Sequence, residues 1–164
     1  MAVVQSRVTD PRTLAGDVQL AIGANYRADP SGTDIGLLGL YFAENPAEPL
    51  FKDNVALILT RCVVDATVDV NDLFDHAFAE ARALSDWTEQ RADRFPISTR
   101  TQGSTVQAGS YRHNGAWLFT VNKFEAYQRG NVVYLLQCTA TTASTELATW
   151  STLIDTVVSA RFDD

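Results

Sequence analysis

The pattern of apolar positions along the chain predicts a series of β-strands. Runs rich in apolar and β-branched residues predict strands at 18–22, 34–43 and 54–64, with weaker strand character at 85–95 and 104–113. The runs at 34–43 and 54–64 are apolar at consecutive positions, which is typical of strands that are buried on both faces. We therefore expect these two strands near the middle of a sheet that is covered on both sides.

Two short turns organise the last strands of this series. Asn114-Gly115 is a pair that tolerates the positive φ angles of a type I′ hairpin, and Gly130-Asn131 suits a type II′ hairpin with glycine first. Together the turns predict an antiparallel three-stranded meander made of residues 104–113, 117–128 and 132–141.

Counting in steps of two through these turns predicts which residues lie opposite one another. The expected pairs are Arg112 with Trp117, Lys123 with Cys138, Phe124 with Gln137, and Tyr127 with Tyr134. One face of the meander then collects Trp117, Phe119, Val121, Lys123, Glu125, Tyr127, Tyr134 and Leu136. The other face collects Leu118, Asn122, Phe124, Ala126, Val133 and Leu135. Because neither face is cleanly polar, we expect both to be covered at least in part.

Two helices can supply this cover. Residues 70–85 place apolar side chains at helical spacing along one side, and residues 144–161 do the same around Trp150. Ser144 is available as the N-cap of the second helix, and Arg161 would close its last turn. The sequence therefore predicts one α+β domain over residues 1–164, an antiparallel sheet of about six strands with helices packed on its faces.

Composition and charge narrow the possible partners. The chain has 164 residues and a net charge of −7, so it can bury a substantial core but lacks the basic surface that nucleic acid requires. Its first residues do not resemble a signal peptide, and no apolar run is long enough to span a membrane. We therefore expect a cytoplasmic protein without membrane insertion, or a secreted or envelope protein if a leader was removed. Cys62 and Cys138 lie in strand-like runs, where two buried thiols are expected and a disulfide remains possible.

Groups that could carry catalysis are sparse. Asp72, His76 and Glu80 form one stripe at helical spacing that could hold a metal, but the stripe lies opposite Phe74 and Phe78, where solvated residues belong. His113 adjoins a hairpin turn. The acid pairs in loops, Asp29 with Asp34 and Asp65 with Asp69, are typical of solvated surface. There is no nucleophile elbow, phosphate-binding glycine loop or zinc spacing, so we expect no enzyme activity and assign no catalytic residue, cofactor or metal ligand.

Aromatic residues of the meander offer a different lead. Its mixed face combines rings with charges, a composition that protein interfaces favour. We predict a protein-binding adaptor or chaperone-like module whose partner contacts Trp117, Lys123, Glu125, Tyr127, Arg129 and Tyr134. The competing interpretation is that a helix covers the apolar end of this face and the charges emerge beyond the helix edge. The alternative function is small-molecule or lipid binding in a pocket between the sheet and helix 70–85, lined by Phe74 and Phe78.

Two segments resemble a known superfamily. "FKDNVALIL" resembles the entry to a central strand in PsbP-like proteins, and "VVYLLQCTATTASTELATWSTLIDTVVSARF" is similar to their C-terminal strand and helix. The nearest resemblance is to actinobacterial LpqN-type lipoproteins. It implies an α/β/α sandwich and a mostly non-enzymatic role. This chain lacks the leader and lipobox cysteine of those lipoproteins, and no functional residue of the superfamily can be carried over to a position here.

Overall fold

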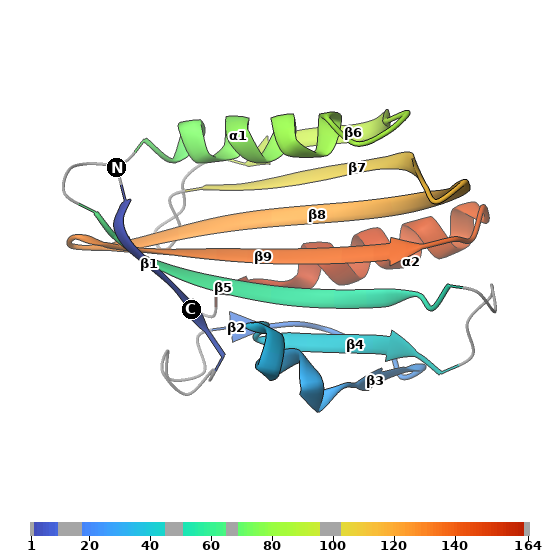
Figure 1. The fold of residues 1–164 in the computed structure, drawn as a ribbon, viewed down its shortest axis with the longest axis horizontal. Helices are drawn as coiled ribbons and strands as arrows, with labels where there is room; N and C mark the ends of the chain where they lie inside the picture. The colour runs from blue at the N-terminus through green and yellow to red at the C-terminus, as the bar shows by residue number, and fades with distance from the viewer. Residues whose placement is uncertain (1, 10–17, 45–50, 65–68, 96–102, 163–164) are drawn as a thin grey trace.

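A large antiparallel sheet with a helix on each face forms the computed structural model of this chain (Figure 1). The structure describes residues 2–9, 18–44, 51–64, 69–95 and 103–162. The eight strands of the sheet are β1 (Ala2–Val8), β3 (Tyr26–Ala28), β4 (Gly39–Ala43), β5 (Asn54–Val64), β6 (Thr88–Phe95), β7 (Gly103–His113), β8 (Ala116–Arg129) and β9 (Val132–Thr142). The predicted α+β class with helices on an antiparallel sheet is confirmed.

The strand order places the longest strands in the centre. The order is β3-β4-β5-β9-β8-β7-β6, and β1 pairs with β5 beyond the end of β4. Two further strands, β2 (Val18–Gln19) and β10 (Arg161–Phe162), pair with each other in a separate two-stranded sheet. The expected number of about six strands was too low, because β1 and the short β3 at the margin of the sheet carry no clear strand pattern.

The meander follows the predicted register. Arg112 pairs with Trp117, Lys123 with Cys138, Phe124 with Gln137, and Tyr127 with Tyr134. Asn114 and Gly115 both have positive φ, 51° and 80°, as a type I′ turn requires. Gly130 has φ 60°, which fits the first central position of a type II′ turn. The turn residues therefore determine the pairing of β7, β8 and β9.

Two predicted strands are shorter than expected. Of the run 34–43, only Gly39–Ala43 is a strand, because the 3₁₀ helix η2 (Pro30–Ile35) extends into its start and ends at Gly36, whose φ is 84°. Of the run 18–22, only Val18–Gln19 pairs, and it does so outside the main sheet.

Helix α2 (Leu147–Ser159) also differs from its predicted ends. Its N-cap is Glu146 and not Ser144, and Arg161 lies beyond the helix in β10. Trp150 donates its indole N–H to the Ser144 carbonyl over 2.7 Å, which holds the link that precedes the helix.

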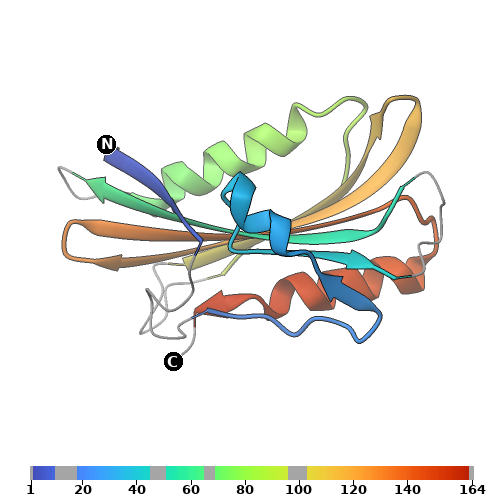
Figure 2. The same cartoon turned by 60° about the horizontal axis from the view of Figure 1, so that its bottom comes forward.

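The helices cover the two faces unequally. Figure 2 shows helix α1 (Val70–Arg82) and η2 on one side of the sheet and α2 on the other. The main core lies under α2, where Leu153 and Val157 pack on the odd-numbered side chains of β5 and β8 and the even-numbered ones of β9. Under α1 a smaller cluster forms around Phe74 and Ala126.

The two cysteines lie on opposite faces of the sheet. Cys138 pairs with Leu57 and is fully buried, whereas Cys62 pairs with Val133, five positions along the same two strands. Because successive side chains along a strand point to opposite faces, an offset of five positions places the two thiols on opposite faces of the sheet. Both thiols are free, so the disulfide that the sequence left open is absent.

Candidate functional site

The predicted partner face is the face that α2 covers. Lys123 and Glu125 on β8 are only 9% and 8% exposed. The Lys123 Nζ atom donates to the carbonyl oxygens of Val158 over 2.8 Å and Ala160 over 2.6 Å, and it lies 3.9 Å from Glu125 Oε2. Glu125 Oε2 also accepts from the backbone N–H of Phe162 over 3.3 Å. The two charges therefore hold the C-terminal end of α2 and the start of β10.

Burial affects the chemistry of Lys123. Loss of hydration lowers the pKa of its ammonium group, and the nearby Glu125 carboxylate partly opposes that shift. Because the ammonium bonds to helix carbonyls, it satisfies acceptors that a helix C-terminus leaves unpaired. One interpretation of the sequence expected the charges to emerge beyond the helix edge, but Lys123 and Glu125 lie under α2, and of the three charged residues only Arg129 is exposed.

The remaining residues of the predicted face are separated by α2. Tyr127 and Tyr134 are half-buried, with ring centroids 6.5 Å apart, and Tyr127 also contacts Phe162 at 5.8 Å. Arg129 is exposed at the far hairpin. Trp117, at the other end of the sheet, is 50% exposed. The six residues predicted to contact a partner therefore do not form one accessible surface in this fold, because α2 and β10 cover Lys123 and Glu125.

Trp117 instead belongs to a surface at the end of the sheet, which we call the tryptophan corner. It consists of Phe51, the hairpin residues 113–119, the link 143–145 and Trp150. Figure 1 shows why these segments meet: the β7–β8 hairpin and the link from β9 into α2 leave the sheet at the same end. Leu147, in the first turn of α2, is 75% exposed.

Two adjoining cavities give the corner its shape. One, of about 210 Å³, lies between Trp117, the link and Trp150. The other, of about 770 Å³, extends from Trp117 toward Phe51 and His113. The wall of the smaller cavity is rigid, because Phe119 and Trp150 stack with centroids 4.2 Å apart and ring planes 4° from parallel.

The chemistry of the corner favours binding an apolar group. Arg112 places its guanidinium 5.6 Å from the centre of the Trp117 ring, which is a cation–π contact. An exposed tryptophan beside an arginine and an apolar cavity has the composition of an interface anchor.

The hairpin half of this corner could be predicted from the sequence, because Asn114-Gly115 is followed by Trp117. The half that comes from 143–145 was missed, because no local pattern shows that this link returns to the hairpin.

The opposite face of the sheet is partly open. Between α1 and η2, no helix of the described residues lies over the middle of the central strands β8, β9 and β5 (Figures 1 and 2). Phe124, Leu135 and Ile58 are only partly buried on this face. Between them runs a polar row: Gln137 donates to Thr139 over 3.3 Å, and Thr139 donates to Asn122 over 2.6 Å. We call this surface the open sheet face.

The pocket predicted under helix 70–85 is filled. Phe74 and Phe78 are 3% and 6% exposed, and Phe74 packs with Ala126, Phe124 and Leu135. Phe78 contacts the guanidinium groups of Arg82 and Arg94 at 5.4 and 5.1 Å. The cavities at the Trp117 hairpin and beside the end of α2 are lined by no residue of α1 that the structure describes. The two phenylalanines therefore anchor the helix to the sheet.

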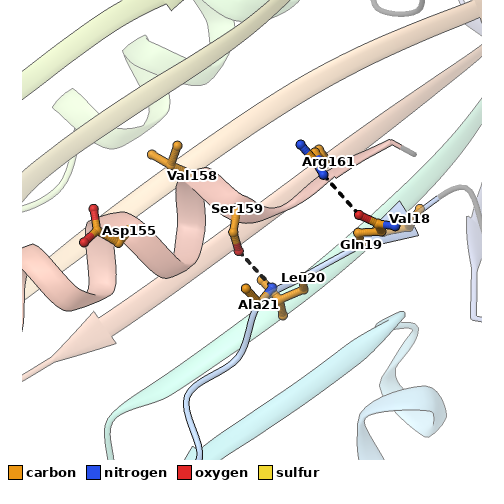
Figure 3. A pocket seen from close by; sticks show the side chains of 8 residues that line it. All are labelled: Val18, Gln19, Leu20, Ala21, Asp155, Val158, Ser159 and Arg161. Carbon is orange, nitrogen blue, oxygen red and sulfur yellow. Dashed lines mark hydrogen bonds between the residues drawn. The ribbon is translucent and has the colours of Figure 1, made fainter. Parts of the chain in front are cut away.

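The third cavity, of about 810 Å³, separates residues 18–21 from the last turns of α2 (Figure 3). Ser159 bridges it by accepting from the Ala21 N–H over 2.9 Å, and Arg161 bridges it by donating to Gln19 over 3.3 Å. It is an open groove, with the exposed Val158 on one wall.

The acidic residues and the histidine that the sequence offered as candidate metal ligands or catalytic groups lie on the solvated surface. His76 lies 3.1 Å from Glu80 on the exposed side of α1, and Asp72 is exposed beside them. Within the described residues no group of three or more His, Cys, Asp or Glu side chains is arranged to hold a metal. Asp29 accepts from Ser31 as the N-cap of η2, a bond that lowers the pKa of its carboxyl. Asp34 is exposed, Asp69 caps α1, and Asp65 lies outside the described residues.

Comparison with known proteins identifies a family and a similar solved structure. Residues 38–161 match the model of the family described as "Probable lipoprotein LpqN". The crystal structure of LpqN of Mycobacterium tuberculosis, a protein involved in cell envelope biogenesis, superimposes with a TM-score of 0.77 at 17% identity. The alignment covers 98% of this chain and 91% of that one. No curated protein matches the sequence.

These matches bear on location. A lipoprotein family does not support the cytoplasmic location expected from the sequence, and it is compatible with the secreted or envelope alternative. No helix in the described part of the chain is both long and apolar enough to cross a membrane.

Proposed function

This chain belongs to the LpqN lipoprotein family, and from that membership we propose that it is a non-catalytic binding protein of the cell envelope that holds a protein partner at the tryptophan corner. The solved relative is described as involved in cell envelope biogenesis, which supports the location and the process. The observation that carries the proposal is the half-exposed Trp117, held by Arg112 beside an apolar cavity.

The corner fits a protein side chain better than a whole small molecule. The smaller of its two cavities, of about 210 Å³, is below the roughly 300–1,000 Å³ of typical ligand pockets. The wider cavity beside it continues the surface toward Phe51, so a partner could insert one apolar side chain and spread over the rest. Aromatic and arginine anchors at the centre of a patch carry most of the binding energy in protein interfaces.

The proposal is tested by affinity capture from detergent-solubilised envelopes of the source organism, read by mass spectrometry. Trp117→Ala should lose one protein that the parent chain enriches, while its thermal unfolding remains within a few degrees of the parent. Ile35→Ser is the matched control, because Ile35 is also apolar and 72% exposed but lies on η2, away from the corner. Equal capture by the parent and Trp117→Ala would refute the corner as the binding site.

A second candidate function follows from the open sheet face. Its partly buried Phe124, Leu135 and Ile58 flank the hydrogen-bonded row of Asn122, Thr139 and Gln137, so it could hold a lipid or small molecule with an apolar part and a polar group. Native mass spectrometry of the purified chain would test this function. A bound mass that survives gel filtration and disappears in Leu135→Asp would support it, and a ligand-free spectrum after mild purification would argue against it.

A further inference from the structure

We infer that Asp53 is a positioning residue of the tryptophan corner: from beneath the surface it fixes the link 143–145, and so keeps the smaller cavity in the shape that takes one apolar side chain of the partner. The inference rests on the proposed function, because it concerns how that same site is held.

The register of the sheet brings Asp53 to the start of the link. Asn54, the first residue of β5, pairs with Thr141 near the end of β9, so Asp53 and Thr142 are neighbours just beyond this pair. Both lie at the end of the sheet where β9 leads into α2 (Figure 1). The Asp53 carboxyl accepts hydrogen bonds from the Thr142 hydroxyl and from the backbone N–H of Ala143, the first residue of the link.

A chain of hydrogen bonds continues from this carboxyl to the wall of the smaller cavity. The Thr142 hydroxyl accepts from the Ser144 backbone N–H over 2.9 Å, and the Ser144 carbonyl accepts from the Trp150 indole N–H over 2.7 Å. Trp150 stacks on Phe119, and both rings line the cavity together with Trp117. The position of the cavity wall therefore depends on a carboxyl that does not itself line the cavity.

Asp53 gives the link a fixed but costly point of attachment. Its backbone carbonyl accepts from the Ala43 N–H over 2.9 Å, so the residue is held at the edge of the sheet. Its side chain is 7% exposed, and the Oδ1 atom is buried without a hydrogen-bond partner in the part of the chain that the structure describes. An unpaired buried acceptor destabilises a fold, and departures of this kind are typical of groups that hold a functional site.

The link also determines what the cavity can accept. Because the indole N–H of Trp150 is already bonded to the Ser144 carbonyl, this ring offers only its carbon atoms to a partner. If the link moved away, the indole N–H would lose its acceptor, and the wall would present an unpaired polar group to an incoming apolar side chain.

Solvent exchange measured by NMR tests the position of the link in the purified full chain, with no partner present. Asp53→Ala removes the acceptor, and it should speed exchange of the Ala143 amide and the Trp150 indole N–H by about tenfold. Asp53→Asn keeps one carbonyl oxygen for the link and should leave both rates near those of the parent. Thr142→Val interrupts the chain of bonds but nearly preserves shape, so it should speed the indole N–H and not the Ala143 amide.

Capture from solubilised envelopes tests the consequence for binding, at a temperature where circular dichroism shows each variant to be folded. Asp53→Ala and Thr142→Val should recover about tenfold less of the protein that the parent enriches, and Asp53→Asn should recover it as the parent does. Thr156→Val is the matched control, because the buried Thr156 hydroxyl bonds to the Thr152 carbonyl within α2 over 3.0 Å. It should change neither exchange nor capture.

Two results would overturn the inference. Unchanged exchange of the Trp150 indole N–H in Asp53→Ala would show that the carboxyl does not hold the cavity wall. Faster exchange with capture equal to that of the parent would show that the position of the link does not matter for binding. Should Asp53→Ala fail to fold, Thr142→Val decides both points. If the parent itself captures no protein, the proposed function fails, and the exchange rates still decide whether Asp53 holds the link.

Discussion

Replacing Lys123 by methionine tests how strongly the buried pair stabilises the fold. Methionine has nearly the same length, so the change removes the charge and its donors while largely preserving volume. It removes the ammonium that lies 3.9 Å from Glu125 Oε2 and leaves two carbonyls at the end of α2 without their donor. Removing one member of a buried ion pair costs roughly 3–5 kcal/mol.

A free-energy loss of this size predicts a measurable fall in the melting temperature Tm of the variant. For a chain of this size roughly 2–4 °C of Tm accompanies each kcal/mol, so Lys123→Met should lower Tm by about 6–20 °C. The double variant Lys123→Met/Glu125→Leu removes both charges and should recover part of the loss. It should not recover all of it, because the Phe162 N–H and the α2 carbonyls remain unpaired.

Urea unfolding followed by circular dichroism would measure both variants against the parent. Exposed ion pairs contribute only about 0–1 kcal/mol. A loss below about 1 kcal/mol for Lys123→Met would show that this ammonium is solvated, and it would refute the burial of the Lys123–Glu125 pair under α2.

Three further changes have defined outcomes. Gly109→Ala should destabilise the fold by about 1–3 kcal/mol in urea unfolding, because a Cβ at 109 would lie 2.5 Å from the Trp87 ring; an unchanged midpoint would contradict that packing. Burial raises the pKa of the Asp53 carboxyl in the folded state, so its ionisation begins to oppose folding once the pH exceeds the ordinary value of 3.8 and does so fully above the raised folded-state pKa. Asp53→Asn should therefore stabilise the chain at pH 7, with the gain vanishing near pH 3; a variant less stable than the parent at pH 7 would refute this. Burial raises the pKa of Cys138 to about 12, so a thiol reagent at pH 8 should label Cys62 first and Cys138 only on unfolding, and labelling of both in the folded chain would contradict the model.

Features set by local chemistry were predictable from the sequence. The glycine turns at 114–115 and 130–131 determine the register of β7, β8 and β9, and turn residues act over a few positions. The apolar periodicity of α1 likewise predicted the side of that helix that faces the sheet. For α2 the predicted apolar side included Leu147 and Val158, which are 75% and 40% exposed.

Features set by distant segments were not predictable. Lys123 and Glu125 occupy alternate positions of a strand, a pattern that indicates a solvated face when its surroundings are unknown. Only the packing of α2 and the pairing of β10 with β2, about 140 residues away along the chain, bury them. The expectation that they contact a partner failed for this reason, whereas Trp117 remains a candidate because no element covers its hairpin in the described structure.

Only part of the tryptophan corner could be predicted from the sequence, for a related reason. Trp117 and its cross-strand neighbour Arg112 follow from the hairpin register. The cavity beside them exists because the 143–145 link passes the hairpin before α2 begins, and no property of that link alone reveals its path. Sequence reasoning therefore located the anchor but not the space next to it.

Site-specific photo-crosslinking in the source organism tests the central claim most directly. A photoreactive phenylalanine analogue would replace Trp117 in one strain and the exposed Ile35 in another. Binding at the tryptophan corner predicts one discrete crosslinked protein from position 117 and none from position 35. No adduct at 117, or the same adducts at both positions, would contradict it.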